Sequence, residues 1–307
     1  MLFRFLLFVG LALTSTLATA QDISVPELGR EFRNVQAAVD AIGEGRGTVL
    51  LAPGRYRQCA VQTAGVVTFR SAEPGQAVFD GATCEGKAAL VLRGRGATVD
   101  GIVFQNMRVP DLNGAGIRLE RGDLDIVNSM FRNSEQGILT ADDPSSAIRI
   151  DRSTFSGLGR CGDHPCAHSI YIGNYGSLTV TRSRFERGTG GHYVKSRAAR
   201  AEIIDNMFDD SQGRETNYMI DLPAGATGRI AGNYFVQGEN KENYSALIAV
   251  GAEDRLHPSA GLAITGNRAR IVEGVARNTI FVADWSGERL VQSGNQLGEG
   301  IGSFERR

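Results

Sequence analysis

Lysine is scarce in this chain. Lys87, Lys195 and Lys241 are the only three among 33 lysines and arginines, and the formal net charge is −1. Without an excess of positive charge there is no extended field to attract nucleic acid or an anionic membrane surface. Nucleic acid is therefore not expected as a partner. An acidic polymer would need a local basic patch, so the setting of each lysine matters.

Long apolar runs are also lacking after residue 20. Before that point, Arg4 precedes an apolar stretch too short to cross a bilayer, and Ala18-Thr19-Ala20 has the small-x-small form of a cleavage site. The pattern predicts a signal peptide over residues 1–20, hence a secreted or periplasmic protein with no membrane insertion. A membrane anchor is the disfavoured alternative, because polar residues follow at once with nothing basic among them.

Cysteine is limited to Cys59, Cys84, Cys161 and Cys166. In an exported protein an even number suggests disulfides, and the order along the chain favours Cys59–Cys84 and Cys161–Cys166. The close pair has a metal-site alternative, since Asp163, His164 and His168 lie beside it. Structural zinc usually takes two close ligand pairs, and one is visible here.

A short tag ending in phenylalanine returns every two to three dozen residues, which is typical of a solenoid. Its copies are Asn128-Ser129-Met130-Phe131, Arg152-Ser153-Thr154-Phe155, Arg182-Ser183-Arg184-Phe185, Asp205-Asn206-Met207-Phe208 and Gly232-Asn233-Tyr234-Phe235.

Short strands flank each tag. An alternating strand such as 178–180 precedes it, and a variable polar loop and a second strand such as 169–172 follow. Strands this short, with Gly and Asn at the bends, fit the coil of a parallel β-helix. We expect Asn to take the left-handed conformation at the bends, and the Asn and Phe side chains to stack about 4.8 Å apart. A β-sandwich would instead show two-residue Asn-Gly or Asp-Gly hairpin turns between strands.

The start of the mature chain predicts a cap for this solenoid. Residues 34–42 form an amphipathic helix begun by Asn34, and 48–56 give the first strand. A helix there would cover the open end of the coil against edge-to-edge association. We therefore expect an all-β protein, a single-stranded right-handed parallel β-helix over residues 21–307 with a short N-terminal capping helix.

A helix, a VLLAPGxY strand and coils with an N-x-F tag together resemble the pectate-lyase-like superfamily over nearly the whole mature chain. The resemblance implies the right-handed parallel β-helix fold. It leaves the activity open, because that fold carries polysaccharide lyases, glycoside hydrolases, epimerases and phage or surface adhesins.

The coils from about 168 to 253 hold the candidate site. Period-two alternation places Ile170, Ile172 and Val194 inward, so Tyr171, Tyr193, Lys195 and Arg197 are predicted to point outward. His192 has the inward parity, unless the bend at Gly190-Gly191 turns it to the surface. Further substrate-binding candidates are His168, Asn174, Asp221, Glu253 and Arg118.

This gathering suits β-elimination on a uronate-containing polysaccharide. Arg197 can hold a carboxylate in bidentate fashion, and Lys195, if crowded by cations, would have a lowered pKa and serve as base. Tyr171 or Tyr193 would protonate the leaving oxygen, and His168 or His192 is an alternative base. The first hypothesis is thus an exported, monomeric lyase that acts on an acidic polysaccharide.

Other interpretations stay open. A hydrolase or uronate epimerase would use the same groove, but a hydrolase needs two carboxylates flanking the bond, and Asp142-Asp143 is interpreted as a polar turn. Lys195 and Asp221 would also make an ordinary surface ion pair, and the tyrosines a stacked ladder. A non-catalytic glycan-binding β-helix is the third possibility. No cofactor is assigned; calcium stays open, although the chain has no compact acidic motif.

Overall fold

The computed structural model describes residues 22–162 and 165–307. The predicted signal peptide lies outside the described residues, as do Asp163 and His164 of the alternative metal site. In the described part of the chain, no helix is both long and apolar enough to cross a membrane.

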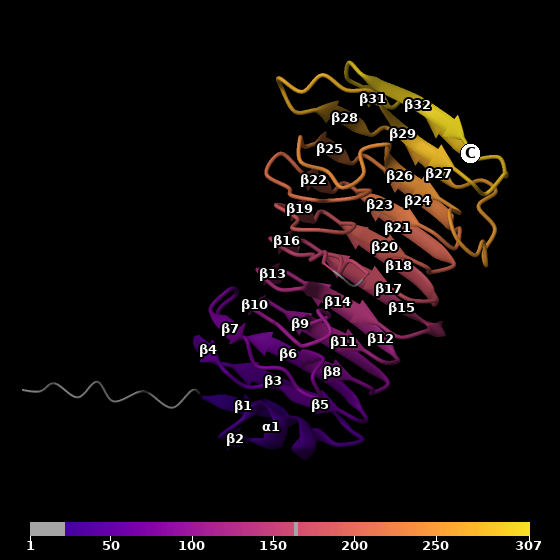
Figure 1. Ribbon diagram of the computed structural model, residues 1–307. Coiled ribbons are helices and arrows are strands. Elements are labelled where there is room, and N and C mark those ends of the chain that lie inside the picture. The colour runs from indigo at the N-terminus through magenta and orange to yellow at the C-terminus, as the bar shows by residue number, and fades with distance from the viewer. Residues whose placement is uncertain (1–21, 163–164) are drawn as a thin grey trace, which may run out of the picture.

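The strands form three sheets that run the length of an elongated coil (Figure 1). The first sheet holds β1 (Ile23–Val25), β2 (Arg30–Phe32), β3 (Arg46–Leu51), β6 (Val66–Ser71), β9 (Gly96–Asp100), β12 (Asp123–Val127), β15 (Asp143–Asp151), β18 (Tyr175–Thr181), β21 (Arg200–Ile204), β24 (Thr227–Ala231), β27 (Ala263–Thr265) and β30 (Val291–Ser293). Only β1 pairs antiparallel with its neighbours in this sheet, β2 and β3.

The second sheet holds β4 (Gly54–Tyr56), β7 (Ala77–Asp80), β10 (Ile102–Gln105), β13 (Met130–Arg132), β16 (Thr154–Ser156), β19 (Arg184–Glu186), β22 (Met207–Asp209), β25 (Tyr234–Gln237), β28 (Arg268–Ile271) and β31 (Gln296–Leu297). The third sheet holds β5 (Ala60–Gln62), β8 (Ala88–Leu92), β11 (Ala115–Leu119), β14 (Gln136–Thr140), β17 (Ile170–Ile172), β20 (Val194–Ser196), β23 (Ile220–Leu222), β26 (Ala246–Val250), β29 (Thr279–Asp284) and β32 (Ile301–Arg306). Each coil crosses the three sheets in turn, which confirms the predicted right-handed parallel β-helix.

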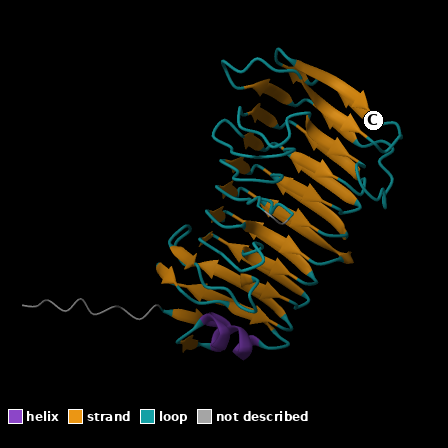
Figure 2. Ribbon diagram, viewed as in Figure 1, coloured by secondary structure: helices purple, strands orange, loops and turns teal. Residues whose placement is uncertain are grey.

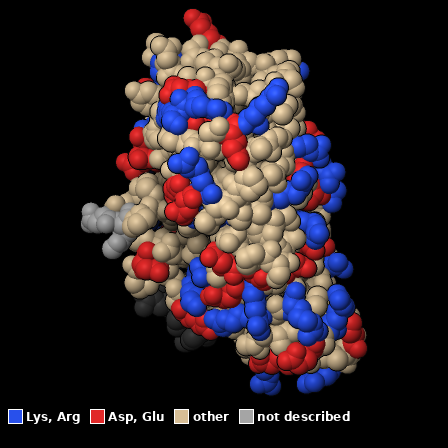
Figure 3. Space-filling view, turned by 90° about the vertical axis from the view of Figure 1, so that its right-hand side faces the viewer, with Lys and Arg blue, Asp and Glu red and all other residues tan. Residues whose placement is uncertain are grey.

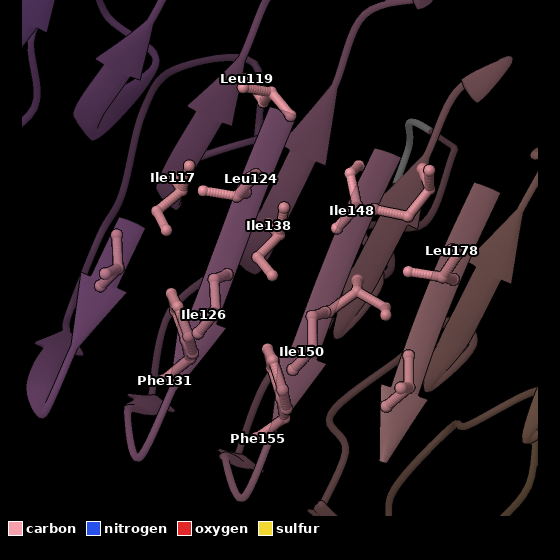
Figure 4. Packing of buried hydrophobic residues seen from close by; sticks show 14 of the residues in the cluster. Ile117, Leu119, Leu124, Ile126, Phe131, Ile138, Ile148, Ile150, Phe155 and Leu178 are labelled. Atoms are coloured by element: carbon pink, nitrogen blue, oxygen red, sulfur yellow. The ribbon is translucent and has the colours of Figure 1, made fainter. Parts of the chain in front are cut away.

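The phenylalanines of the tag form one continuous stack inside the coil. It runs from Tyr56 through Phe79, Phe104, Phe131, Phe155, Phe185 and Phe208 to Phe235, with neighbouring ring centroids 4.8 to 5.6 Å apart. Around it, the inward residues of the first and third sheets fill the core in layers, as Ile117, Leu124 and Ile148 do in Figure 4. The predicted phenylalanine ladder is confirmed.

A polar ladder follows the bend between the first and second sheets. The backbone N–H of Ser183 donates to Asn206 Oδ1, that of Asn206 to Asn233 Oδ1, and that of Asn233 to Asn267 Oδ1, at 2.9 to 3.0 Å. The expectation that the tag asparagines take the left-handed conformation is confirmed at Asn128, with φ 51°, but is wrong for Asn206 and Asn233. That conformation belongs to the preceding residue, for example Asp205 with φ 58° and Gly232 with φ 66°. The Asn side chain instead supplies the acceptor that the buried amide below it needs.

One helix, α1 (Val35–Ile42), covers the N-terminal end of the coil beside a single 3₁₀ turn, η1 (Pro26–Leu28) (Figure 2). Asn34 caps α1 by accepting from Ala37 N at 2.8 Å, and its buried face is Val35, Ala38, Val39 and Ile42. The segment 48–56 was predicted as the first strand, but β1 and β2 precede it. It is also divided into β3 and β4, because Pro53, between them, has no N–H for the ladder where the chain bends. The predicted disulfides, Cys59–Cys84 and Cys161–Cys166, are both present.

Candidate functional site

The outward positions of the third sheet stack into a file across the coils. Arg118, Leu139, Tyr171, Lys195 and Asp221 are consecutive register partners on β11, β14, β17, β20 and β23. Tyr171 is partly exposed between inward Ile170 and Ile172, as the alternation predicts. Lys195 and Asp221 are only 8% and 3% exposed, so they form the floor of the site rather than its rim.

A chain of charged contacts joins these residues. Lys195 Nζ donates to Asp221 Oδ2 at 3.1 Å and to Glu253 Oε1 at 2.8 Å. The other oxygen of Glu253 accepts from Arg197, whose Nε donates to the Tyr171 hydroxyl oxygen at 3.2 Å. Lys195 Nζ also lies 5.8 Å from the centre of the Tyr171 ring. Tyr171 thus has Arg197 at its hydroxyl and Lys195 near its ring.

The prediction that Lys195 has a lowered pKa is wrong. Burial disfavours its charged form, but the carboxylates of Asp221 and Glu253 outweigh burial and raise the pKa of the ammonium. A protonated lysine cannot accept a proton. Lys195 is therefore a fixed cation, and so is Arg197, whose bonds to Tyr171 and Glu253 raise its pKa against the effect of burial.

The two carboxylates that bind Lys195 have pKa values shifted in opposite directions. Burial raises the pKa of Asp221 to about 6, although Lys195 opposes the shift. The pKa of Glu253 is lowered, because Lys195 and Arg197 outweigh its smaller burial. Glu253 is 40% exposed at its side chain and reaches the surface, whereas Asp221 does not.

The outward placement of Tyr193 is also wrong. Tyr193 lies in the core at 1% exposure, against Phe185 and Phe208, and its hydroxyl donates to Asp210 at 2.7 Å. Burial raises the pKa of Tyr193 well above the ordinary value, which makes it a poor acid. The alternation fails here because β20 begins only at Val194; the bend before it lets two neighbouring residues both face inward.

The same bend turns His192 away from the core. His168, His192 and Tyr218 stack across three coils, with centroids 4.9 and 5.5 Å apart. The backbone N–H of His192 donates to His168 Nδ1 at 3.0 Å, and His192 Nε2 lies 3.4 Å from Asp221 Oδ2. His192 is thus turned out of the core but is only 9% exposed, so the alternative of a turn to the surface is not realised.

Neither histidine has the pKa near neutrality that a general base needs. Burial, with the charge of Lys195, lowers the pKa of His168 to about 3. Burial and the neighbouring His168 lower the pKa of His192 well below the ordinary value. Both rings are neutral, and because His168 Nδ1 accepts a bond, its proton lies on Nε2.

Of the remaining candidates, Asn174 lies near the charged cluster and Arg118 does not. Asn174 belongs to the site, since its side-chain oxygen lies 3.0 Å from His257 Nε2. Arg118 does not contact the charged cluster: Leu139 separates it from Tyr171, and its Nε donates to Glu120 at 3.1 Å. Asp143 accepts bonds from Gly122, Ser145 and Ser146. The prediction of a polar turn is wrong here, because Asp143 begins strand β15, whose register with β18 is irregular between Asp143 and Ala147.

A loop that was not predicted completes the site. Residues 251–262 connect β26 to β27 and fold back over earlier coils; we call this segment the return loop. It carries Glu253, Asp254, which lies 3.3 Å from Arg197, and His257, whose Nε2 is 3.1 Å from the Arg197 carbonyl. Its length was the available signal, because the equivalent connections after β14, β17 and β20 are two to three residues.

Beside the cluster lies an open hollow of about 520 Å³ on the third sheet. Its floor is formed by His168, Tyr171, Lys195 and Arg197, and its walls include Asn113, Gln136 and Pro165. Leu139, Tyr171 and Lys195 line it from β14, β17 and β20, so the hollow spans three neighbouring strands of the sheet. Within the described residues, no three His, Cys, Asp or Glu side chains converge as metal ligands.

Charges of both signs are mixed on the surface. In the face drawn in Figure 3, blue and red atoms lie beside each other rather than in separate regions. Any attraction for an acidic ligand must therefore act locally.

Comparisons with known proteins agree on the fold. The YbhC protein of Escherichia coli matches with a TM-score of 0.54 and 12% identity over 96% of this chain and 88% of that one. A pectin methylesterase from Aspergillus niger matches with a TM-score of 0.53 and 10% identity over 87% and 82%. ORF18 of Geobacillus virus E2 matches with a TM-score of 0.57 and 12% identity over 89% of this chain and 56% of that one. No protein-family model and no curated protein sequence matches.

These likenesses define the class of protein by its fold, a right-handed parallel β-helix shared with these solved structures. The resemblance expected from the sequence is confirmed at that level. At 10 to 12% identity it shows the fold alone, so function has to be argued from the site.

Proposed function

We propose that the protein cleaves an acidic, uronate-containing polysaccharide by β-elimination in the hollow of the third sheet. The observation that carries the proposal is Tyr171, which lines the hollow, accepts a hydrogen bond from Arg197 at its hydroxyl and has Lys195 near its ring. A tyrosine oxygen held in this way can take a proton and later return it.

The reaction assigns a role to each group. A uronate carboxylate binds Lys195 and Arg197 in place of the Glu253 carboxylate, which neutralises the sugar and makes its C5 proton more acidic. Tyr171 takes the C5 proton, the C4–oxygen bond breaks, and a C4–C5 double bond forms. The proton held by Tyr171 passes to the leaving oxygen, so the phenol–phenolate cycle closes without another reactant.

The cellular setting proposed is extracytoplasmic. Two disulfides support it, because such bonds persist in oxidising compartments. Among the similar structures, one is described as a pectin methylesterase, a protein named for a polysaccharide substrate.

The test compares Tyr171→Phe with Tyr218→Phe on a panel of uronate polymers. The first change removes the proposed proton carrier, and the second removes a nearby hydroxyl with no role in the proposal. Ultraviolet absorbance of the unsaturated product should fall at least about 10²-fold with Tyr171→Phe and little with Tyr218→Phe. Equal activity of Tyr171→Phe and the unmodified protein would remove Tyr171 from the mechanism.

A second candidate is hydrolysis by Asp221 and Glu253. Both carboxylates bind one ammonium, and the pKa of one is raised while that of the other is lowered, as in an acid and nucleophile pair. The 3% exposure of Asp221 argues against it, because the acid must reach the glycosidic oxygen. New reducing ends without unsaturated product would favour this candidate.

A further inference from the structure

A second hollow, of about 600 Å³, lies over the loops that connect the second sheet to the third. Arg108, Arg187 and Arg214 line it, together with Asn133, Thr189 and Gln212. No acidic residue lines this hollow, and it shares no lining residue with the hollow at Tyr171.

The three arginines of this hollow have no carboxylate partner. Many arginines elsewhere on the coil pair with a carboxylate on a neighbouring rung, such as Arg149 with Asp125, Arg182 with Asp151 and Arg229 with Glu202. Arg187 and Arg214 make no side-chain hydrogen bond or ion pair with any described residue, and Arg108 bonds only the carbonyl of Met107. Guanidinium groups gathered without counter-charges repel one another, so the arrangement contributes nothing to stability by itself.

Arg187 also occupies a strained backbone position. It has φ 55°, where the equivalent residues at the ends of β13 and β16 are Asn133 and Gly157, which suit the left-handed conformation. Arg152 and Arg182 are left-handed too, but each forms an ion pair with Asp151. Among the described residues nothing offsets the strain at Arg187, and uncompensated strain points to a functional role.

The chemistry of the lining selects the ligand. Free guanidinium groups bind carboxylate or sulfate groups in bidentate fashion, and amide and hydroxyl side chains suit the hydroxyls of a sugar. No aromatic side chain lines the hollow, whereas single-stranded nucleic acid is usually held by stacking on such rings.

We propose that Arg108, Arg187 and Arg214 form a second, non-catalytic binding site for the anionic groups of an acidic glycan. The site does not depend on the elimination chemistry at Tyr171 and would hold equally in a protein that only binds glycans.

The test measures binding of an oligouronate and of a sulfated oligosaccharide by calorimetry. All samples carry Arg197→Gln, so that binding at the third-sheet hollow is weakened equally and the probe is not consumed. The test variant is Arg187→Asn with Arg214→Gln. The control, Arg46→Gln with Arg289→Gln, removes the same charge from two exposed arginines elsewhere that also have no side-chain partner among the described residues. Thermal unfolding midpoints check that every variant is folded.

The proposal predicts that the test variant binds at least one probe about tenfold or more weakly, while the control stays within about twofold. The proposal is overturned by equal weakening in both variants, by no binding in any sample, or by single-stranded DNA of equal charge binding as tightly as the glycan. Because turnover is not measured, failure here leaves the proposal for Tyr171 untouched.

Discussion

Lys195 Nζ lies between the carboxylates of Asp221 and Glu253, which come from coils 26 and 58 residues further along the chain. This placement determines both its charge and its contribution to stability. Removing one partner of a buried ion pair is strongly destabilising, because the other charge is left uncompensated.

Lys195→Met should therefore lower the free energy of unfolding at pH 7 by about 3 kcal/mol, as well as abolish turnover. Lys87→Met, at a lysine 41% exposed, should change stability by less than about 0.5 kcal/mol. Urea denaturation measures both. If Lys195→Met is as stable as Lys87→Met, Lys195 is an ordinary surface lysine.

His168 gives a pH dependence with a definite sign. The unfolded chain protonates this residue near pH 6.5, but the folded protein does so only near pH 3. Between these values the unfolded state binds more protons, so stability falls as the pH drops, by up to about 1.4 kcal/mol per pH unit. Asp221, with its raised pKa, acts in the opposite direction between about pH 4 and 6.

His168→Asn keeps an acceptor for the His192 amide and removes the titration. Its unfolding free energy should fall less steeply between pH 6.5 and 4 than that of the unmodified protein. Both proteins contain His192 and Asp221, so the difference between the two pH profiles comes from residue 168. Parallel pH profiles would show that His168 is not held neutral by burial.

At the scale of elements, the coil is stabilised by ladders that repeat along it. Asn233 is 1% exposed; it accepts from Asn206 N, and its Nδ2 donates to the Ile203 carbonyl at 2.8 Å and to Asn267. Its loss would remove the side-chain partner of the buried Asn206 N–H and of the Ile203 carbonyl.

Asn233→Ala should cost about 2–4 kcal/mol, whereas Asn128→Gly, at an exposed left-handed position, should cost less than about 0.5 kcal/mol. Equilibrium unfolding in guanidinium chloride compares them. A small cost for Asn233→Ala would mean that water replaces the ladder bonds.

The return loop controls access to the cations of the site. Its Glu253 carboxylate bonds both Lys195 and Arg197, so a substrate carboxylate has to displace it. Glu253→Gln should lower KM for a uronate polymer by roughly fivefold, which corresponds to about 1 kcal/mol of lost competition. Asp254→Asn, which changes an outer contact, should have a smaller effect in steady-state kinetics. A raised KM in Glu253→Gln would show that Glu253 binds substrate instead.

Most of the helices, strands and ladders could be predicted from the sequence, because the repeated tag, the helix cap and the strand alternation are local signals. Tyr171 was placed correctly because it lies inside β17, where alternation holds. Tyr193 was misplaced because it precedes β20, where the backbone bends. The length of the return loop was visible in the sequence, but its contacts with Lys195 and Arg197, and the pKa of Lys195, depend on distant coils that no local pattern encodes.

At the scale of the whole molecule, the β-helix provides a long outer face on which residues from successive coils come together. The fold alone is compatible with enzymes and with binding proteins, so the central claim is chemical: the hollow at Tyr171 breaks an acidic polysaccharide by elimination.

The most direct test is the mass of the products formed from a uronate polymer. Elimination adds no water, so each cleavage should give one unsaturated fragment, one water lighter than the saturated oligomer of the same length. Cleavage that gives only saturated fragments would show hydrolysis and contradict the account.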